Sequence, residues 1–259
     1  MSYLRLGDAT TIAEWPDLIE ELDRWEAEDR VATLWWRDDD ATTATPELDA
    51  LVRLGRDVPL ALAVIPALAR RELASALDGA ADIRVLQHGW EHRNHAVTGK
   101  KSEYPAGRPA DDVAAEIAAG RTRLAEMFGA QGLPVLVPPW NRIAHDYLPL
   151  LPGEGIRGVS VMGSPPSAPP PPGLAALDVH LDLVAWRDGR GFIGSATALG
   201  RLVGCLQANR FAAGPARPIG ILTHHLIQDA ATAAFLERLV ALTRSHGAAR
   251  WAAAGEFLQ

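Results

Sequence analysis

The sequence predicts an α/β fold in which about seven parallel strands form a (β/α) barrel. The first observation behind this prediction is that short apolar runs alternate with amphipathic stretches along the chain. Alternation of this kind is typical of parallel strands joined by right-handed crossovers. The second observation is length, since about seven such units fit into 259 residues. That number favours a barrel of the (β/α) kind over an open, doubly wound sheet.

Six apolar runs are predicted as buried strands, because each has four to six residues, the usual length of a strand. In chain order they are Ala32–Trp36, Leu60–Ile65, Ile83–Gln87, Pro134–Val137, Gly158–Met162 and Ile219–Thr223. Three amphipathic segments with end signals are predicted as helices. They run from the Thr-Pro pair at 45–46 to Gly55, from Asp111 to Phe128 and from Asp229 to His246.

Neither an internal repeat nor a domain linker is visible, so one domain covering residues 1–259 is expected. The proline-rich segment Ser164–Gly173 is interpreted as a stiff surface loop within this domain. Cys205 is the only cysteine, which excludes an internal disulfide and a cysteine-cluster metal site.

Composition excludes two classes of partner. A net charge of −7 argues against nucleic-acid binding, which normally needs a basic patch. No segment approaches the roughly 20 apolar residues of a membrane span, and the first residues, MSYLRLGDATT, lack the apolar core of a signal peptide. A cytoplasmic location is therefore expected, with export left open if a signal segment has been removed. The oligomeric state cannot be inferred from the sequence.

Ionisable residues directly follow three of the predicted strands. The strand ending at Trp36 leads into Arg37–Asp40, the strand ending at Gln87 into His88–His92, and the strand ending at Thr223 into the pair His224–His225. Because the carboxyl ends of parallel barrel strands share one face, these side chains should converge there. Active sites of such barrels are built on the same face.

Each group has an ordinary interpretation beside the functional one. Three successive aspartates can form a solvated turn, although clustered charge beside a buried strand favours a bound cation. His88 and His92 can share one metal ion if the intervening residues form a turn of helix. His224 and His225 point to opposite sides of an extended strand, so only one of them should face the site. Two histidines with one carboxylate would leave open positions for water and substrate.

Taken in order, these residues resemble the five motifs of the polysaccharide deacetylases, the carbohydrate esterase group that includes chitin and peptidoglycan deacetylases. The resemblance extends from Trp36 to His225. The matching segments are the aspartates within Arg37–Asp40, the pair His88 and His92, the turn Pro138–Arg142, Asp182 with Trp186, and Leu222–His224. The family fold is a distorted (β/α) barrel, in agreement with the strand and helix pattern.

Carried over by position, the resemblance implies Asp38 as the catalytic base and His224 as the general acid. It implies a divalent cation, with Zn²⁺ as the expected ion, held by Asp39, His88 and His92. The implied activity is hydrolysis of an N-acetyl or related acyl group on a sugar or aminosugar.

The resemblance further implies an acyl pocket formed by Trp140 and Trp186, with the Trp140 backbone N–H directed at the developing oxyanion. Arg142 is expected at the substrate, and Asp182 is expected to orient His224. His225 is expected to support the site from behind.

Three positions depart from the family pattern. Asp40 stands where the family has glycine, so the roles of the three aspartates could shift by one residue. Val137 stands where an arginine usually pairs with the base, and Arg37 or Arg142 could replace it. Gly89 replaces a small hydroxyl residue. Two alternatives therefore stay open: a metal-dependent amidase or esterase acting on a small non-sugar molecule, and a sugar-binding barrel without activity.

Overall fold

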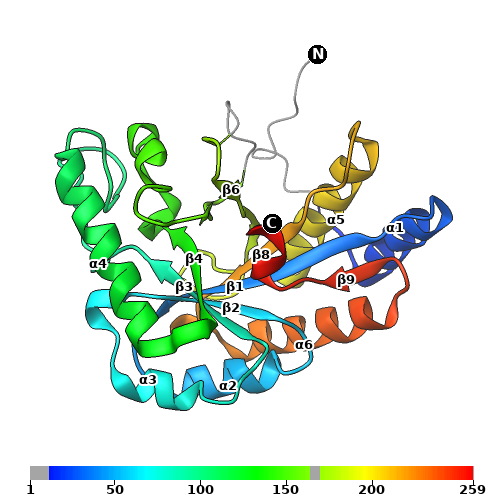
Figure 1. The fold of residues 1–259 in the computed structure, drawn as a ribbon. Coiled ribbons are helices and arrows are strands. Elements are labelled where there is room, and N and C mark those ends of the chain that lie inside the picture. Colours follow the sequence, from blue (N-terminus) through cyan, green and yellow to red (C-terminus); the bar gives the residue numbers. More distant parts are fainter. Residues whose placement is uncertain (1–11, 164–169, 259) are drawn as a thin grey trace.

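A computed structural model describes residues 12–163 and 170–258 (Figure 1). The first eleven residues, on which the signal-peptide argument rested, lie outside this range, as do residues 164–169 of the predicted proline-rich loop. In the described part, nine strands form one sheet in which every pairing is parallel. The strands are β1 Ala32–Ala41, β2 Leu60–Val64, β3 Ile83–His88, β4 Gly132–Val137, β5 Gly158–Val159, β6 Ala175–Ala176, β7 Val179–Asp182, β8 Ile219–Thr223 and β9 Ala249–Trp251.

The sheet runs in the order β6-β5-β4-β3-β2-β1-β8-β7, and β9 pairs with the first residues of β1. It curls into a half-open barrel with helices on its outer side (Figure 1). The predicted distorted (β/α) barrel is therefore confirmed. All six predicted strands are present, while β6, β7 and β9 are additional short strands of two to four residues.

Six α-helices occur within the described residues. They are α1 Trp15–Ala27, α2 Pro46–Leu54, α3 Arg71–Ala76, α4 Ala110–Phe128, α5 Ser195–Phe211 and α6 Ala230–Ser245. The three predicted helices correspond to α2, α4 and α6. Thr45 caps α2 by accepting a hydrogen bond from the Leu48 N–H, and Asp229 caps α6 through the Thr232 N–H. None of the helices in this part of the chain combines the length and apolar composition of a membrane-spanning segment.

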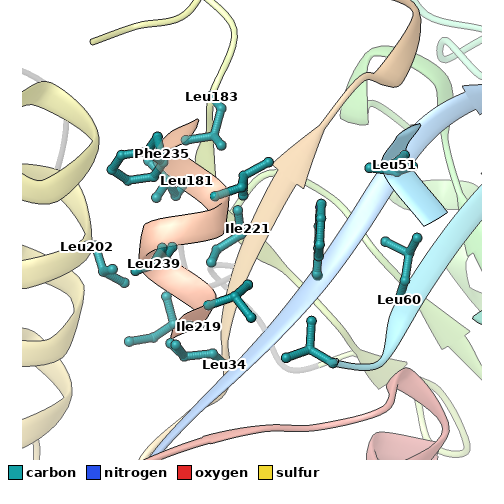
Figure 2. Packing of buried hydrophobic residues seen from close by; sticks show 14 of the residues in the cluster. Leu34, Leu51, Leu60, Leu181, Leu183, Leu202, Ile219, Ile221, Phe235 and Leu239 are labelled. Carbon is teal, nitrogen blue, oxygen red and sulfur yellow. The ribbon is translucent and has the colours of Figure 1, made fainter. Parts of the chain in front are cut away.

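The main hydrophobic core lies between the outer face of the sheet and the helices. In Figure 2, Leu34, Ile219 and Ile221 of neighbouring strands point toward Phe235 and Leu239 of α6. All five side chains are buried. Burial of a side chain of this kind contributes about 1.5–3 kcal/mol, so this layer is the principal source of stability.

A second, smaller core fills the inner side of the barrel. Trp35 packs there with Val135, Val179 and Leu222, and Ala254 of the C-terminal 3₁₀ helix Ala254–Leu258 adjoins them. Trp36, the next residue of β1, instead belongs to the outer core. Successive side chains of β1 thus alternate between the helices and the barrel interior, as expected for a strand.

Candidate active site

A β-bulge ends strand β1 at its polar residues. Asp38 pairs with Leu62 of β2, but the next paired residue is Ala41, opposite Val64, so β1 contains one residue more than its neighbour. Asp40 adopts the left-handed conformation, with φ of 73°. Aspartate tolerates this conformation better than most residues. The alternation of side chains therefore breaks at this point, so that Asp39 and Asp40 can both lie on the inner side of the barrel.

Asp38 precedes the bulge and points to the other side of the sheet. It is fully buried and accepts hydrogen bonds from Thr223 Oγ1 at 2.6 Å and from His225 Nδ1 at 2.5 Å. Trp36 Nε1 donates to the same Thr223 hydroxyl at 2.8 Å. Burial lowers the pKa of His225, but the hydrogen bond and the charge of Asp38 outweigh this effect and leave the pKa raised. Asp38 thus joins β1 to the end of β8 from behind the site.

We therefore expect Asp38→Asn to affect stability more than chemistry. The amide cannot satisfy both buried donors as the carboxylate does, so the free energy of unfolding should fall by about 2 kcal/mol. Turnover and metal affinity should stay within about tenfold of wild type, a small change beside the effect of removing a general base. Chemical denaturation, combined with an activity assay, measures both. A loss of turnover by several orders of magnitude in a folded variant would return the base role to Asp38.

Asp39 forms a buried ion pair with Arg37 on the inner face of β1. Arg37 Nε lies 2.9 Å from Asp39 Oδ1, and Arg37 Nη2 donates to Asp39 Oδ2 at 3.0 Å. Arg37 also donates to Ser160 Oγ and to Asn141 Oδ1, both at 2.6 Å. A guanidinium held on several sides keeps the paired carboxylate oriented. Of the two arginines considered, Arg37 and not Arg142 thus pairs with one of the three successive aspartates.

Asp40, His88 and His92 bring their ligand atoms together. Asp40 Oδ1 lies 3.1 Å from His88 Nε2 and 3.4 Å from His92 Nε2. The potential ligand atoms of all three residues fall within 4.8 Å of one another. The family resemblance implies Asp39 in this group, but in the structure Asp40 occupies that place. The shift by one residue follows from the bulge, which turns Asp40 toward the histidines.

The hydrogen bonding of His88 suits a metal ligand. Its Nδ1 lies 3.0 Å from the Val137 carbonyl oxygen, which can only accept, so Nδ1 carries the proton. In the neutral ring, Nε2 then presents a lone pair toward the Asp40 carboxylate. Two acceptors facing each other need either a proton or a cation between them. The residues present therefore fit a divalent cation.

Charges around this cluster act in opposite directions on its members. Burial would raise the pKa of Asp40, but its hydrogen bond to His88 and the nearby imidazoles hold it well below the usual range. Burial lowers the pKa of His88, yet Asp39 and Asp40 leave it raised overall. Burial and the neighbouring His88 lower the pKa of His92, which keeps that ring neutral. Asp40 and His92 are thus held in the forms that bind metals, whereas on His88 a cation would take the place of the Nε2 proton.

His88 and His92 meet without the turn of helix expected from their spacing. His88 is the last residue of β3, and the residues after it form an irregular loop. Gly89 and His92 both adopt positive φ, 59° and 57°. The Glu103 carboxylate accepts hydrogen bonds from three backbone N–H groups of this loop. No sequence signal pointed to Glu103, which lies 15 residues beyond the first histidine, later in the same connection between β3 and α4.

Trp140 lies beside the cluster, with its ring centroid 4.4 Å from that of His92. It belongs to the 3₁₀ helix Pro139–Asn141, in which Trp140 and Asn141 both have φ of 56°. This tight turn after β4 brings Asn141 into contact with Arg37. Arg142, predicted at the substrate, instead donates to the Lys101 carbonyl oxygen at 2.8 Å.

His224 lies at the end of β8 and packs edge-on against Trp186, with ring centroids 4.8 Å apart. Trp186 is 46% exposed and its Nε1 donates to Asp182 Oδ2 at 2.7 Å. Asp182 thus holds the indole that packs against His224, and burial raises the pKa of Asp182 although the charge of the nearby His224 offsets part of this effect. His224 Nδ1 is buried and lacks a hydrogen-bond partner among the described residues. The adjacent His225 points away, as the alternation of an extended strand predicts.

A second group of potential ligands, Asp23, Glu26 and His246, lies on the outer surface. His246 Nδ1 accepts from the Ala248 N–H at 3.1 Å, so Nε2 carries the proton and donates to Asp23 Oδ1 at 3.1 Å. Both ring nitrogens are already engaged. Neither nitrogen of His246 is therefore free to bind a metal, in contrast to the cluster of Asp40, His88 and His92.

Neither protein-family models nor curated proteins match the sequence. Solved structures do match over most of the chain. A protein of Mycobacterium smegmatis assigned as a polysaccharide deacetylase has a TM-score of 0.64 at 17% identity, covering 95% of this chain and 91% of its own. A family 4 acetyl xylan esterase from Clostridium thermocellum, in complex with cobalt, has a TM-score of 0.55 at 12% identity, covering 87% and 89%.

A third similar structure is a pseudoenzyme of carbohydrate esterase family 4 from Bacillus anthracis, with a TM-score of 0.56 at 11% identity. The match covers 89% of this chain and 66% of that protein. Enzymes and a pseudoenzyme thus share this architecture, and activity has to be argued from the side chains at the barrel end. The chain has the fold of the family 4 carbohydrate esterases and polysaccharide deacetylases.

Proposed function

We propose that this protein is a divergent polysaccharide deacetylase that removes an acetyl or related acyl group from a sugar or aminosugar. The observation that carries the proposal is the arrangement at the barrel end. A carboxylate with two imidazoles, a separate carboxylate paired with an arginine, and a third imidazole beside an exposed indole all lie there. These are the parts that metal-assisted acyl hydrolysis needs. The whole chain, residues 1–259, is proposed to act as one catalytic unit.

Asp40, His88 and His92 would hold the cation, for which Zn²⁺ is the first candidate given two nitrogen ligands and one oxygen ligand. A bound divalent cation supplies Lewis-acid polarisation of the acyl carbonyl and lowers the pKa of a water molecule. Three protein ligands leave positions open for substrate and water.

Asp39 is proposed as the general base. Its carboxylate is buried beside the cluster but takes no part in it, and Arg37 fixes its orientation. A base needs a fixed position within reach of the proton that it removes. The ion pair with Arg37, which includes the hydrogen bond from Nη2 to Asp39 Oδ2, provides that position.

His224 is proposed as the general acid. Its ring lies at the end of the neighbouring strand β8, against the exposed Trp186, and no described residue hydrogen-bonds its Nδ1. Protonated, it would deliver a proton to the departing amine or alcohol. Trp140 lies against His92 and Trp186 against His224, and both are proposed to seat the acyl group. The backbone N–H of Trp140 is proposed to donate to the developing oxyanion.

Release of acetate from a panel of acetylated sugars tests the proposal. The panel contains an acetylated monosaccharide, a short oligomer, a long chitin-like polymer and a non-sugar acetamide, each assayed with and without Zn²⁺ or Co²⁺. Metal-dependent release from a sugar supports the proposal, and comparison of the members sets the preferred size. Release from the acetamide alone would favour an amidase, and release from none would leave a barrel without activity.

For the general acid we expect a defined loss. His224→Ala should lower turnover by about two orders of magnitude, since proton transfer to the leaving group is lost while metal and base stay in place. His225→Ala serves as the matched control, because that imidazole bonds Asp38 behind the sheet. Loss of turnover in the His225 variant alone, with its fold intact, would transfer the acid role to His225.

A further inference from the structure

Glu103 is a fully buried carboxylate outside every helix and strand of the described chain. Its Oε1 accepts from the Glu91 N–H at 2.9 Å and from the Arg93 N–H at 3.4 Å, and its Oε2 accepts from the Trp90 N–H at 3.1 Å. Burial still raises the pKa of Glu103, because the three amides offset only part of the cost of removing the group from water. Burial of this carboxylate is unfavourable in free energy, which suggests that the group has a role at this position.

The carboxylate occupies space that a side chain at position 89 would otherwise take. A Cβ atom on Gly89 would lie 1.8 Å from Glu103 Oε2 and 2.6 Å from a ring carbon of Pro139. Gly89 also has positive φ, which favours glycine independently. The absence of a side chain at 89 and the presence of the carboxylate at 103 are therefore complementary.

The loop held by Glu103 is the one that joins the two candidate imidazole ligands. His88 is fixed by the β3 ladder and by the Val137 carbonyl, but His92 follows three residues of irregular backbone and itself has positive φ. Glu103 binds the N–H groups on both sides of His92, those of Glu91 and Arg93. The bonds to the carboxylate thus bracket the second ligand.

We propose that Glu103 is the positioning residue for His92, acting through the backbone of residues 90–93 to bring its imidazole into the cluster with Asp40 and His88. This inference rests on the metal site of the proposed function. It requires no direct contact between Glu103 and a cation. Groups that orient metal ligands typically contribute about 10- to 100-fold in metal affinity.

The test compares Glu103→Gln with a matched control, Glu21→Gln. Glu21 is also a buried carboxylate, paired with Arg210 at 2.8 Å, but it lies in α1 on the outer side of the barrel. Binding of Zn²⁺ and Co²⁺ is measured by calorimetry, the melting temperature by circular dichroism, and the exchange of backbone amides by mass spectrometry. All three are measured on the full chain.

For Glu103→Gln we expect the Kd for Zn²⁺ to rise by about 10- to 100-fold, with faster amide exchange in residues 90–93. A glutamine turns one NH₂ group toward backbone donors, so at least one of the three bonds is lost. Glu21→Gln should lower the melting temperature and leave the Kd unchanged. An unchanged Kd and unchanged exchange in Glu103→Gln would overturn the proposal, as would equal losses of affinity in both variants.

These outcomes are separable from failure of the proposed function. If the wild type binds Zn²⁺ but releases no acetate from any substrate, the deacetylase proposal fails and the role of Glu103 stands on the Kd comparison. If Glu103→Gln fails to fold, Glu103→Asp keeps the charge with a side chain shorter by one methylene. It should then show the same selective loss of metal affinity. A wild type that binds no metal would overturn the positioning role itself.

Discussion

Asp39→Asn should lower turnover by about three to four orders of magnitude while the protein still binds one divalent cation. The asparagine amide has the shape of the carboxylate but cannot accept the proton. The loss should lie near the upper end of the usual range for a general base, because the substitution also leaves the buried Arg37 without its anionic partner. The same loss of pairing should reduce the free energy of unfolding by about 3 kcal/mol.

Single-turnover kinetics with saturating Zn²⁺, together with calorimetric metal titration, measure this effect. Added metal should not restore turnover, since the cation is already bound. If Asp39→Asn loses its metal and regains activity at high Zn²⁺, Asp39 is a ligand as the sequence first indicated, and the base has to be sought elsewhere.

Asp40→Asn should show the opposite behaviour, with the Kd for Zn²⁺ raised by about 100-fold or more. Loss of a residue that only orients a metal ligand costs up to about 100-fold in affinity, and loss of a ligand itself should cost at least as much. Asp40 supplies the only carboxylate of the cluster, and the pKa of this group lies below its usual range, so it binds as an anion. Asparagine tolerates positive φ, so the bulge should persist and the effect should be on binding alone.

The two asparagine variants form a matched pair, since they make the same chemical change at neighbouring positions. Turnover of Asp40→Asn should recover in part as Zn²⁺ is raised, whereas that of Asp39→Asn should not. Equal metal affinity in both variants would mean that neither carboxylate is a ligand. His88→Ala should also lose stoichiometric metal, and it serves as the positive control for loss of a ligand.

The fold could be predicted because its signals are local. Each of the six predicted strands is a short apolar run, and α2, α4 and α6 carry their own start and stop residues. Helix α5 was not predicted because its apolar residues are spread around the helix and give no clear amphipathic pattern. Its buried residues include a glycine, a cysteine and several leucines. Strands β6 and β9 are too short to carry any alternation.

The residue types of the candidate site could be predicted from the sequence, but the place of each of the three aspartates could not. Strand ends on one face bring Asp, His and Trp residues together, which the sequence indicates without any structure. The assignment among Asp38, Asp39 and Asp40 depends on one extra residue in β1, and nothing in three identical side chains marks where that residue lies. Glu103 was not predictable for a related reason, since its partners are backbone groups and carry no sequence signature.

The bulge in β1 also has an evolutionary consequence. Between Asp38 and Ala41 the strand has one residue more than β2 needs for continuous pairing. Loss of a single codon there would restore a regular ladder and so leave the fold intact, yet it would leave one inward carboxylate where the chain now has two. Loss of three nucleotides would thus remove one of the two carboxylates proposed for the base and for the cation, while the sheet itself stays regular.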